Sequence, residues 1–461
     1  MKLALSRIAE LIGATGEFDS HAVAAGYSID SRTLAPEELF FAVRGERLDG
    51  HDFVEEALRR GAVAAVVCSD QMARFAVRAR LMAVDDTLRA LQALGTAVRR
   101  MWGRTVVAVT GSTGKTTTKE AIAHLLRTKY RVLKSEGNLN NHFGLPLQLL
   151  RLEPQHEIAV IELGMNHRGE IRALGQLSQH DVAVVTNVAP VHLEFFESVA
   201  AIARAKYEII ETLHAGGSAV LNADDEYVSQ FGRDFHGRVL TFGIERPAEV
   251  RAEAVEERGV EGTTFELVAG GCRERVQLPL IGLHNVYNAL AAVAVGLERG
   301  ITPSHAAEAL GSLVPQDKRG QLLDVGGVTV VNDCYNSNPK ALHAMVSSFA
   351  RIPARRHIVV AGEMLELGAA GEELHRRSGA MMAEKKVDVL VGVRGNARHM
   401  VEAAQQAGMA AEFVETPEQA GEWLARQAVA GDAVLLKASR GVKLERALEA
   451  WVSARSSVVG R

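Results

Sequence analysis

The sequence predicts an α/β protein made of three consecutive domains. Its 461 residues are enough for about three domains of ordinary size. Short apolar runs alternate with helix-length segments along most of the chain, which is the pattern of mostly parallel sheets covered by helices. A glycine-rich turn at 111–115 lies between one apolar run and a helical pattern, and it indicates a phosphate-binding loop.

Composition excludes several classes of protein. Hydrophobic residues make up 47% and charged residues 23%, as in soluble globular proteins, and the net charge of −4 gives no reason to expect nucleic acid as a partner. The three cysteines, Cys68, Cys272 and Cys334, have no metal-site or disulfide spacing. No apolar run approaches the ~18 residues of a membrane span, and 1–16 lacks the long apolar core of a signal peptide. We therefore expect a cytoplasmic protein without a membrane span.

Residues 1–85 are expected to form a small α/β domain. Apolar residues between Leu5 and Ile12 recur at helical spacing and predict its first helix. The elements predicted after it are strands at 39–43 and 62–67, with a helix at 52–60 between them.

Residues 86–313 are expected to form the central domain. The apolar run 105–109 predicts the strand before the glycine-rich loop, and Ile122, Leu125 and Leu126 continue the helix after it. The other elements predicted here are strands at 158–161, 182–185 and 219–221, a β-rich insertion at 238–280 and a helix at 285–299.

The glycine-rich loop has the residue types that bind a nucleoside triphosphate. Gly111 and Gly114 allow successive backbone N–H groups to converge on phosphate oxygens, and the following helix N-terminus favours anions. Lys115 supplies a full positive charge, and the Thr116 hydroxyl is placed to bind Mg²⁺. The expected phosphate-binding set is Gly111, Ser112, Thr113, Gly114, Lys115, Thr116 and Thr117. Val109 stands where the common G-x-x-x-x-G-K-[ST] form has glycine, so the loop is a shortened one.

Two residues that follow predicted strands are candidate metal ligands. Glu162 ends the strand 158–161, where a carboxylate either ligates Mg²⁺ beside the phosphate loop or is simply solvated. His192 follows the strand 182–185, and a loop histidine is either a ligand or a structural residue.

Lys206 interrupts an apolar stripe. Ile202 and Ile209 lie on the same predicted helix face, so Lys206 falls in the middle of it. Such a lysine either extends its amine to the surface or is buried, and burial favours a neutral, reactive amine.

Residues 314–461 are expected to form a doubly wound, Rossmann-like domain. The predicted strands are 328–331, 357–360, 387–391 and 433–436, alternating with helices near 339–350, 370–385, 396–407 and 443–454. No G-x-G-x-x-G follows a strand, so the fold is expected without a bound dinucleotide.

The loop T-G-S-T-G-K-T-T-T resembles that of the Mur ligases, which join carboxylates to amines with ATP. Further segments that resemble this family are 282–289 (G-L-H-N-V-Y-N-A), 315–320 (P-Q-D-K-R-G) and 332–339 (N-D-C-Y-N-S-N-P). The resemblance implies that the asparagines of the first segment contact adenine or position the loop, and that the other two segments contact ATP. The nucleotide-binding residues implied are Asn285, Asn288, Arg319, Asp333, Tyr335 and Asn336.

The resemblance extends to both ends of the chain. Asp30-Ser31-Arg32, the segment 39–45 and Asp49-Gly50-His51 resemble the family's UDP-sugar-binding domain, and 137–141 (G-N-L-N-N) resembles a substrate segment. The substrate residues implied are Ser31, Arg32, Gly45, His51, Asn138, Asn140 and Asn141. The segments 362–368, followed by His375, and 437–440 also match, although Asn332, Glu363 and Ala438 replace the more usual Asp, Asp and Gly.

The form Tyr-Asn-x-Asn-Pro implies the family member that adds D-alanyl-D-alanine to UDP-N-acetylmuramoyl-tripeptide. ATP and Mg²⁺ are the implied cofactors, Lys115, Glu162, His192 and Lys206 the catalytic residues, and a carbamate on Lys206 a metal ligand beside His192. We expect a monomer whose domains close on ATP. The nearest alternative is the member that adds the preceding residue, which typically carries an Asp-Asn-Pro-Arg type motif in its third domain when its substrate is diaminopimelate; this chain lacks the motif. Folyl-polyglutamate ligase lacks the first domain and fits less well. A GTPase would require an Asn-Lys-x-Asp segment, which this chain also lacks.

Overall fold

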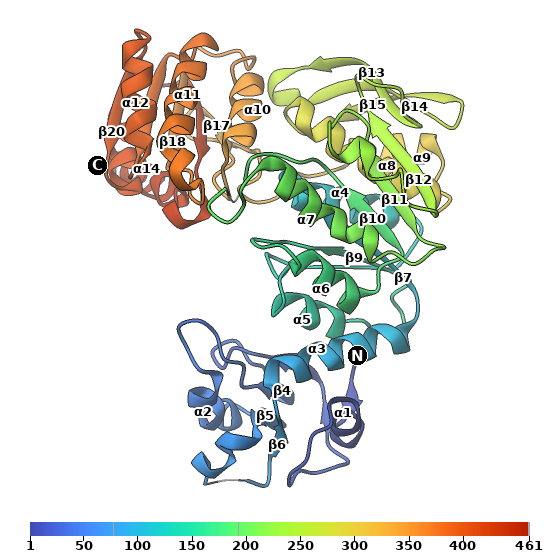
Figure 1. Cartoon of the computed structure of the whole chain (residues 1–461). Helices are drawn as coiled ribbons and strands as arrows, with labels where there is room; N and C mark the ends of the chain where they lie inside the picture. The colour runs from blue at the N-terminus through green and yellow to red at the C-terminus, as the bar shows by residue number, and fades with distance from the viewer. Residues whose placement is uncertain (77, 192, 460–461) are drawn as a thin grey trace.

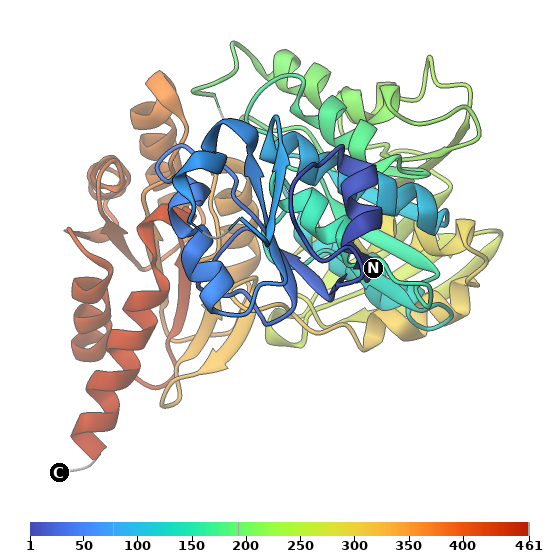
Figure 2. The same ribbon diagram turned by 90° about the horizontal axis from the view of Figure 1, so that it is seen from below.

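The computed structural model describes residues 1–76, 78–191 and 193–459. Figure 1 shows the part of the chain before 85 at one end of the molecule, the central part next to it, and the C-terminal part beside the central one. Figure 2 shows the long last helix, in red, extending to the outer edge of the molecule. Within the described residues, no helix has the length and apolarity needed to cross a membrane.

The first sheet is parallel and has the strand order β3-β4-β5-β6. The predicted first helix and the two predicted strands are confirmed, whereas the helix predicted at 52–60 begins as a 3₁₀ turn. The elements of this part are β1 (Leu3–Ala4), α1 (Leu5–Ile12), β2 (Val23–Ala24), β3 (Gly26–Ser28), β4 (Glu38–Phe41), η1 (Gly50–Phe53), α2 (Val54–Arg59), β5 (Ala64–Cys68), η2 (Ser69–Arg74) and β6 (Leu81–Val84).

Helix α3 (Thr87–Trp102) joins the first part to the central one. It begins where the Asp86 carboxylate accepts the N–H groups of Leu88 and Arg89, and it ends at Gly103 in a left-handed conformation. Its buried residues, including Leu94, belong to one apolar core that runs from the first sheet to the central sheet. The two domains therefore share a core through α3.

The central sheet has nine strands, in the order β15-β14-β13-β12-β11-β10-β7-β9-β8. The strands are β7 (Thr105–Thr110), β8 (Val132–Lys134), β9 (Ile158–Glu162), β10 (Val182–Val185), β11 (Ser218–Asn222), β12 (Arg238–Gly243), β13 (Val250–Glu257), β14 (Thr263–Ala269) and β15 (Cys272–Leu278). Strands β14 and β15 are antiparallel to their neighbours and the rest are parallel. The predicted β-rich insertion is thus the continuation of the central sheet.

Helices cover both faces of the central sheet. Apolar residues alternate along β7, so that Val106 and Ala108 face the core shared with α3, whereas Val107 and Val109 face a second core. The helices on the first face are α5 (Gly144–Leu150), α6 (Glu170–Ser178) and α7 (Val199–Glu211); those on the second are α4 (Lys115–Leu126), α8 (Leu283–Glu298) and α9 (Pro303–Gly311). Two 3₁₀ turns, η3 (Val228–Gln230) and η4 (Gly259–Glu261), lie in this part.

The C-terminal sheet has the order β16-β17-β21-β18-β19-β20, with only β16 antiparallel, and helices on both faces. The doubly wound prediction is confirmed, but three elements were not predicted: β16, β20 and α13. The elements are β16 (Gln321–Asp324), β17 (Thr329–Asn332), α10 (Pro339–Phe349), β18 (His357–Gly362), η5 (Gly368–Ala370), α11 (Gly371–Glu384), β19 (Val389–Val393), α12 (Ala397–Gln406), β20 (Ala410–Val414), α13 (Pro417–Gln427), β21 (Ala433–Lys437), η6 (Arg440–Val442) and α14 (Glu445–Val459).

Candidate active site

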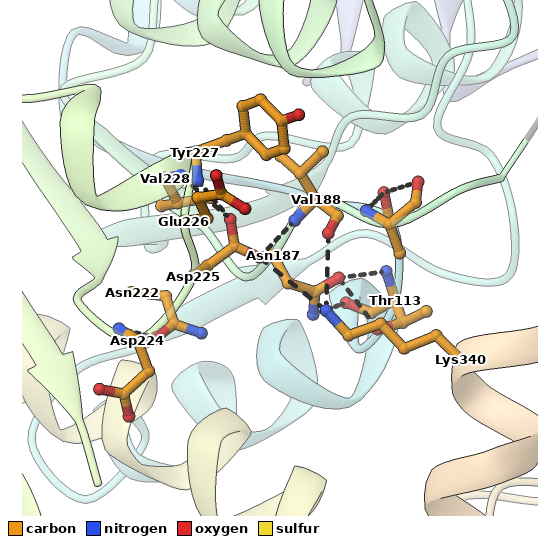
Figure 3. A network of polar contacts seen from close by, with 12 residues as sticks. Thr113, Asn187, Val188, Asn222, Asp224, Asp225, Glu226, Tyr227, Val228 and Lys340 are labelled. Atoms are coloured by element: carbon orange, nitrogen blue, oxygen red, sulfur yellow. Dashed lines mark hydrogen bonds and ion pairs between the residues drawn. The ribbon is translucent and has the colours of Figure 1, made fainter. Parts of the chain in front are cut away.

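The glycine-rich loop connects β7 to α4 and is held from behind by the segment that follows β10. The Ser112 N–H donates to the Asn187 main-chain oxygen at 2.9 Å, and the Thr113 N–H donates to the Asn187 side-chain oxygen at 3.1 Å. The Thr186 hydroxyl donates to the Thr113 carbonyl at 2.7 Å. Figure 3 shows Asn187 directed at Thr113. These bonds hold the backbone of the loop in place against the segment after β10.

Lys115 lies at the start of α4, and its amine is directed back at the loop. Its Nζ donates to the Gly111 carbonyl at 2.9 Å and approaches the Ser112 carbonyl at 3.5 Å. Burial lowers the pKa of Lys115, the Glu162 carboxylate opposes that shift, and the nearby Arg319 charge adds to it. A phosphate group placed on this loop would meet two cations.

Thr116 and Glu162 provide the oxygen ligands expected for a divalent cation. The Thr116 hydroxyl donates to Glu162 Oε2 at 2.8 Å, and the Asn140 amide donates to Glu162 Oε1 at 2.8 Å. Ser135 Oγ accepts the Glu162 N–H at 3.2 Å, and Glu162 is 4% exposed. An oriented carboxylate beside a hydroxyl is a hard donor set that suits Mg²⁺.

Lys206 is buried, as one of the two interpretations of its position requires. It lies on α7 and is 2% exposed. Burial lowers the pKa of its amine well below the usual range, and the Lys115 charge lowers it further. The predicted partner His192 lies outside the described residues. An amine held neutral in this way can react with CO₂, and the resulting carbamate would supply oxygen ligands.

The two asparagines of α8 hold the start of α4. Asn288 Oδ1 accepts the Thr118 hydroxyl at 3.0 Å, and its amide donates to Asn285 Oδ1 at 3.0 Å. Asn285 in turn donates to the Ile281 carbonyl at 2.8 Å. Of the two roles left open for this pair, positioning of the loop is the one that these contacts perform.

Arg319 reaches the loop from the linker before the C-terminal domain. Its guanidinium donates to Thr116 Oγ1 at 3.0 Å and lies 4.0 Å from the centre of the Tyr335 ring. Arg440 lies 5.6 Å from the same ring centre. Arg319 and Tyr335 are therefore brought together with the phosphate loop, as a shared nucleotide site requires.

Lys437 contacts the remaining two candidate nucleotide-binding residues, Asp333 and Asn336. Lys437 is 3% exposed. Its ammonium pairs with Asp333 Oδ2 at 2.5 Å and donates to the Asn336 carbonyl at 3.0 Å. Ser439 Oγ accepts the Leu365 N–H at 3.0 Å and donates to the Ser337 carbonyl. Lys437 was not predicted as a site residue, although the K-A-S-R segment that contains it was a usable signal.

A hollow with a volume of about 140 Å³ lies beside the loop. The residues that line it include Thr116, Lys119, Lys134, Gly137, Arg319 and Tyr335. Lys119 is another residue that was not predicted: it is 1% exposed and donates to the Ser135 carbonyl at 2.7 Å.

The substrate candidates of the central domain lie next to the metal candidates. Asn140 contacts Glu162, as described above, whereas Asn141 accepts the Gly144 N–H at 2.9 Å, where α5 begins. Asn138 is exposed and accepts the Asn140 N–H through its carbonyl at 2.8 Å.

The candidates of the first domain are not joined to this cluster by any contact described. Arg32 is exposed and pairs with Asp30 at 2.7 Å, Ser31 is buried, and the Gly45 N–H donates to the Leu48 carbonyl. His51 is buried, and both its ring nitrogens have partners: Nδ1 lies 2.5 Å from Asp49, and Nε2 accepts the Cys68 N–H at 3.0 Å. His51 therefore shapes this loop from inside the fold.

Three family models match the chain in order: the Mur ligase family catalytic domain at 24–99, the Mur ligase middle domain at 109–296, and the Mur ligase glutamate ligase domain at 318–440. Curated relatives include the UDP-N-acetylmuramoyl-tripeptide–D-alanyl-D-alanine ligases of Bacillus subtilis, 35% identical over 96% of this chain and 97% of the relative, and of Escherichia coli, 36% identical over 82% and 83%.

Similar solved structures include MurF from Acinetobacter baumannii, with TM-score 0.88, 28% identity, and coverage of 98% of this chain and 99% of that one. MurF ligase from Thermotoga maritima in complex with ADP has TM-score 0.83, 30% identity, and coverage of 94% and 99%. Identity of this extent along nearly the whole length, together with three matching domains, shows that this chain belongs to the Mur ligase family.

Proposed function

We propose that this chain is the ATP-dependent ligase that joins D-alanyl-D-alanine to UDP-N-acetylmuramoyl-tripeptide, which is the last cytoplasmic step in making the peptidoglycan pentapeptide precursor. The observation that best supports the proposal is that residues of the central domain and of the linker contact the same atom, the Thr116 hydroxyl oxygen. This hydroxyl bonds both to Glu162 of the central domain and to Arg319 of the linker. ATP bound on this loop would be in reach of the C-terminal domain, as a ligase with substrates on separate domains needs.

The reaction couples two transfers. The terminal carboxylate of the tripeptide attacks the γ-phosphorus of ATP, so a carboxyl oxygen–phosphorus bond forms and the bond to ADP breaks. The free amine of the dipeptide then attacks the acyl carbon, loses a proton and expels phosphate, which leaves the amide. Catalysis of the first step is mainly positioning and charge neutralisation. Lys115 and Arg319 are two cations at the loop that are placed to supply that charge.

Magnesium would be held by Thr116 and Glu162, and when bound it would offset phosphate charge. Asn140 fixes the rotation of the Glu162 carboxylate, so the ligand is oriented before a cation arrives. A second ion is assigned to His192 and a carbamate on Lys206. The burial of Lys206 and its lowered pKa support that assignment.

The UDP-sugar end of the acceptor is assigned to the first domain. Ser31, Arg32, Gly45 and His51 are the residues proposed there, with His51 acting through the loop that it holds. Asn138, Asn140 and Asn141 are proposed to line the path of the peptide towards the metal. We propose a monomer in the cytoplasm, with residues 1–85, 86–313 and 314–461 as its domains.

The experiment is phosphate release from ATP with UDP-N-acetylmuramoyl-tripeptide, with and without D-alanyl-D-alanine, followed by product mass. Release that needs both substrates, with a mass gain of one dipeptide less water, establishes the activity. Release that instead needs the dipeptide precursor and a single amino acid would assign the chain to the preceding step. No release with any pair would overturn the proposal.

A further inference from the structure

The segment that backs the phosphate loop is anchored by a buried carboxylate. The Val188 N–H donates to Asp225 Oδ2 at 2.9 Å, and Asp225 Oδ1 accepts the N–H groups of Tyr227 and Val228, each at 3.1 Å. The preceding residue, Asn187, makes the bonds to Thr113 described above (Figure 3). The position of the Val188 peptide therefore determines where Asn187 meets the loop.

The C-terminal domain also approaches Val188, at its carbonyl. Lys340 lies in the first turn of α10, and its Nζ is 3.5 Å from the Val188 carbonyl oxygen and 3.9 Å from Asp225 Oδ2. The Asp225 side chain is 6% exposed and that of Lys340 is 51% exposed. Figure 3 shows Lys340 extending from its helix towards Val188. One side chain of α10 thus lies near both the Val188 carbonyl and the carboxylate that accepts the Val188 N–H.

The structure of α10 itself does not explain a lysine in its first turn. The helix is already capped by Asn338, whose side chain accepts the Ala341 N–H at 2.9 Å, and Pro339 occupies its first position. A cation in the first turn is opposed by the helix dipole. The favourable partner of Lys340 is Asp225, across the domain boundary. Both distances are at the outer limit of direct contact and would shorten if α10 moved towards Val188.

A second contact places the C-terminal domain against the same stretch of chain. The Glu194 N–H donates to the Glu366 carbonyl at 3.4 Å, and Gly368 lies so close to Glu194 that an added Cβ would be 3.2 Å from its Cα. The C-terminal domain therefore meets this stretch at Val188 and again at Glu194, a few residues from the bonds that hold Thr113.

We propose that Lys340 is a positioning residue that couples the placement of the C-terminal domain to the phosphate loop, through Val188 and Asp225 to Asn187 and Thr113. The proposal deepens the proposed function, because it names how domain approach acts on the nucleotide site. Its test uses nucleotide binding alone, so that it can fail or succeed separately from the ligase assignment.

The probe is a non-hydrolysable ATP analogue with Mg²⁺, and the dissociation constant is measured by calorimetry at low salt and at 0.5 M salt. Surface ion pairs of this kind change an equilibrium about 2- to 5-fold. We expect Lys340→Met to weaken binding about 3-fold, Lys340→Arg to stay within about 2-fold of wild type, and Lys340→Glu to weaken it about 10-fold at low salt. Salt screens the repulsion from Asp225, so the deficit of Lys340→Glu should shrink at 0.5 M.

The control is Lys385→Glu, which changes the net charge by the same amount as Lys340→Glu. Lys385 is exposed and lies at the C-terminal end of α11. At each salt concentration, the dissociation constant of the ATP analogue should be the same for this control as for wild type. The proposal is overturned if Lys340→Glu equals this control at low salt, or if its deficit is unchanged by salt. If Lys340→Glu does not fold, the comparison of Lys340→Met with Lys340→Arg decides by the same criteria.

Discussion

The Thr116 hydroxyl donates to the Glu162 carboxylate at 2.8 Å and accepts a bond from Arg319 at 3.0 Å, a residue 203 positions further along the chain. The three residues come from the start of α4, the end of β9 and the linker before the C-terminal domain. Because the hydroxyl lies between a carboxylate and a guanidinium, cation binding at Glu162 and the position of the linker act on the same atom. This link underlies the first prediction.

Glu162→Gln should weaken Mg²⁺ binding and lower the rate of ATP-dependent ligation about 100-fold at a fixed Mg²⁺ concentration, because an amide is a poor ligand for a hard cation. The measurement is the rate against Mg²⁺ concentration. Glu157→Gln is the matched control, since Glu157 lies just before the other end of β9 and pairs at the surface with Arg131. A Mg²⁺ dependence equal to that of wild type would contradict the role of Glu162.

Lys206→Ala should reduce turnover at least 100-fold, and Lys206→Arg should not restore it, because a guanidinium cannot form a carbamate. The neutral amine that the low pKa provides is the form that reacts with CO₂. ¹³C NMR of protein equilibrated with ¹³C-bicarbonate should show a carbamate signal in wild type that both variants lack. A fully active arginine variant would exclude the carbamate.

The fold was predictable where a strand is apolar throughout and central in its sheet; β6 (Leu81–Val84), which is apolar but lies at a sheet edge, was not predicted. The strands at 158–161 and 182–185 were predicted to within a residue because they are central and buried on both faces. Strand β20 was missed, since Ala410–Val414 lies at a sheet edge and is only partly buried, and β16 has no fully buried residue. Helix α13 was missed because its apolar stripe is short: only Ala420, Trp423 and Leu424 recur at helical spacing.

The site was predictable where a local motif fixes it. The loop from Gly111 to Thr117 follows from its own sequence, but the pairing of Lys437 with Asp333 joins positions more than a hundred residues apart. No local periodicity indicates such a pair, because the order of strands in the sheet brings β21 beside β17. The sequence also could not decide that Asn288 contacts Thr118, because these residues lie on different helices, 170 positions apart.

Acid should destabilise the protein through His180. Burial lowers its pKa to about 4 from 6.5, and its Nε2 bonds to the Ile209 carbonyl at 2.9 Å. Between pH 6.5 and pH 4 the unfolded chain binds a proton at His180 that the native chain does not. The contribution of His180 to the free energy of unfolding is therefore fully present above pH 6.5 and is lost as the pH falls towards 4. The contribution is about 3 kcal/mol.

The urea midpoint of wild type should therefore fall more steeply between pH 7 and pH 5 than that of His180→Gln. His236→Gln, at an exposed position, is the control and should follow wild type. Parallel curves for wild type and His180→Gln would show that His180 does not carry this pH dependence.

Gly114→Ala should damage nucleotide binding far beyond the cost of backbone strain. Gly114 has φ +79°, and an added Cβ would collide with Asn288 Oδ1, which is fixed by Thr118 and Asn285. Gly103→Ala, at φ +64° with its nearest atom at 3.6 Å, carries the same strain of about 1–2 kcal/mol without the collision. We expect the dissociation constant of an ATP analogue to rise more than about 10-fold for Gly114→Ala and less than about 2-fold for Gly103→Ala.

Adding Asn288→Ala to Gly114→Ala removes the colliding oxygen. The double variant should therefore lose less binding free energy than the sum of the losses in the two single variants. Equal effects of the two glycine variants, or simple additivity in the double variant, would show that the Asn288 contact does not set the shape of the loop.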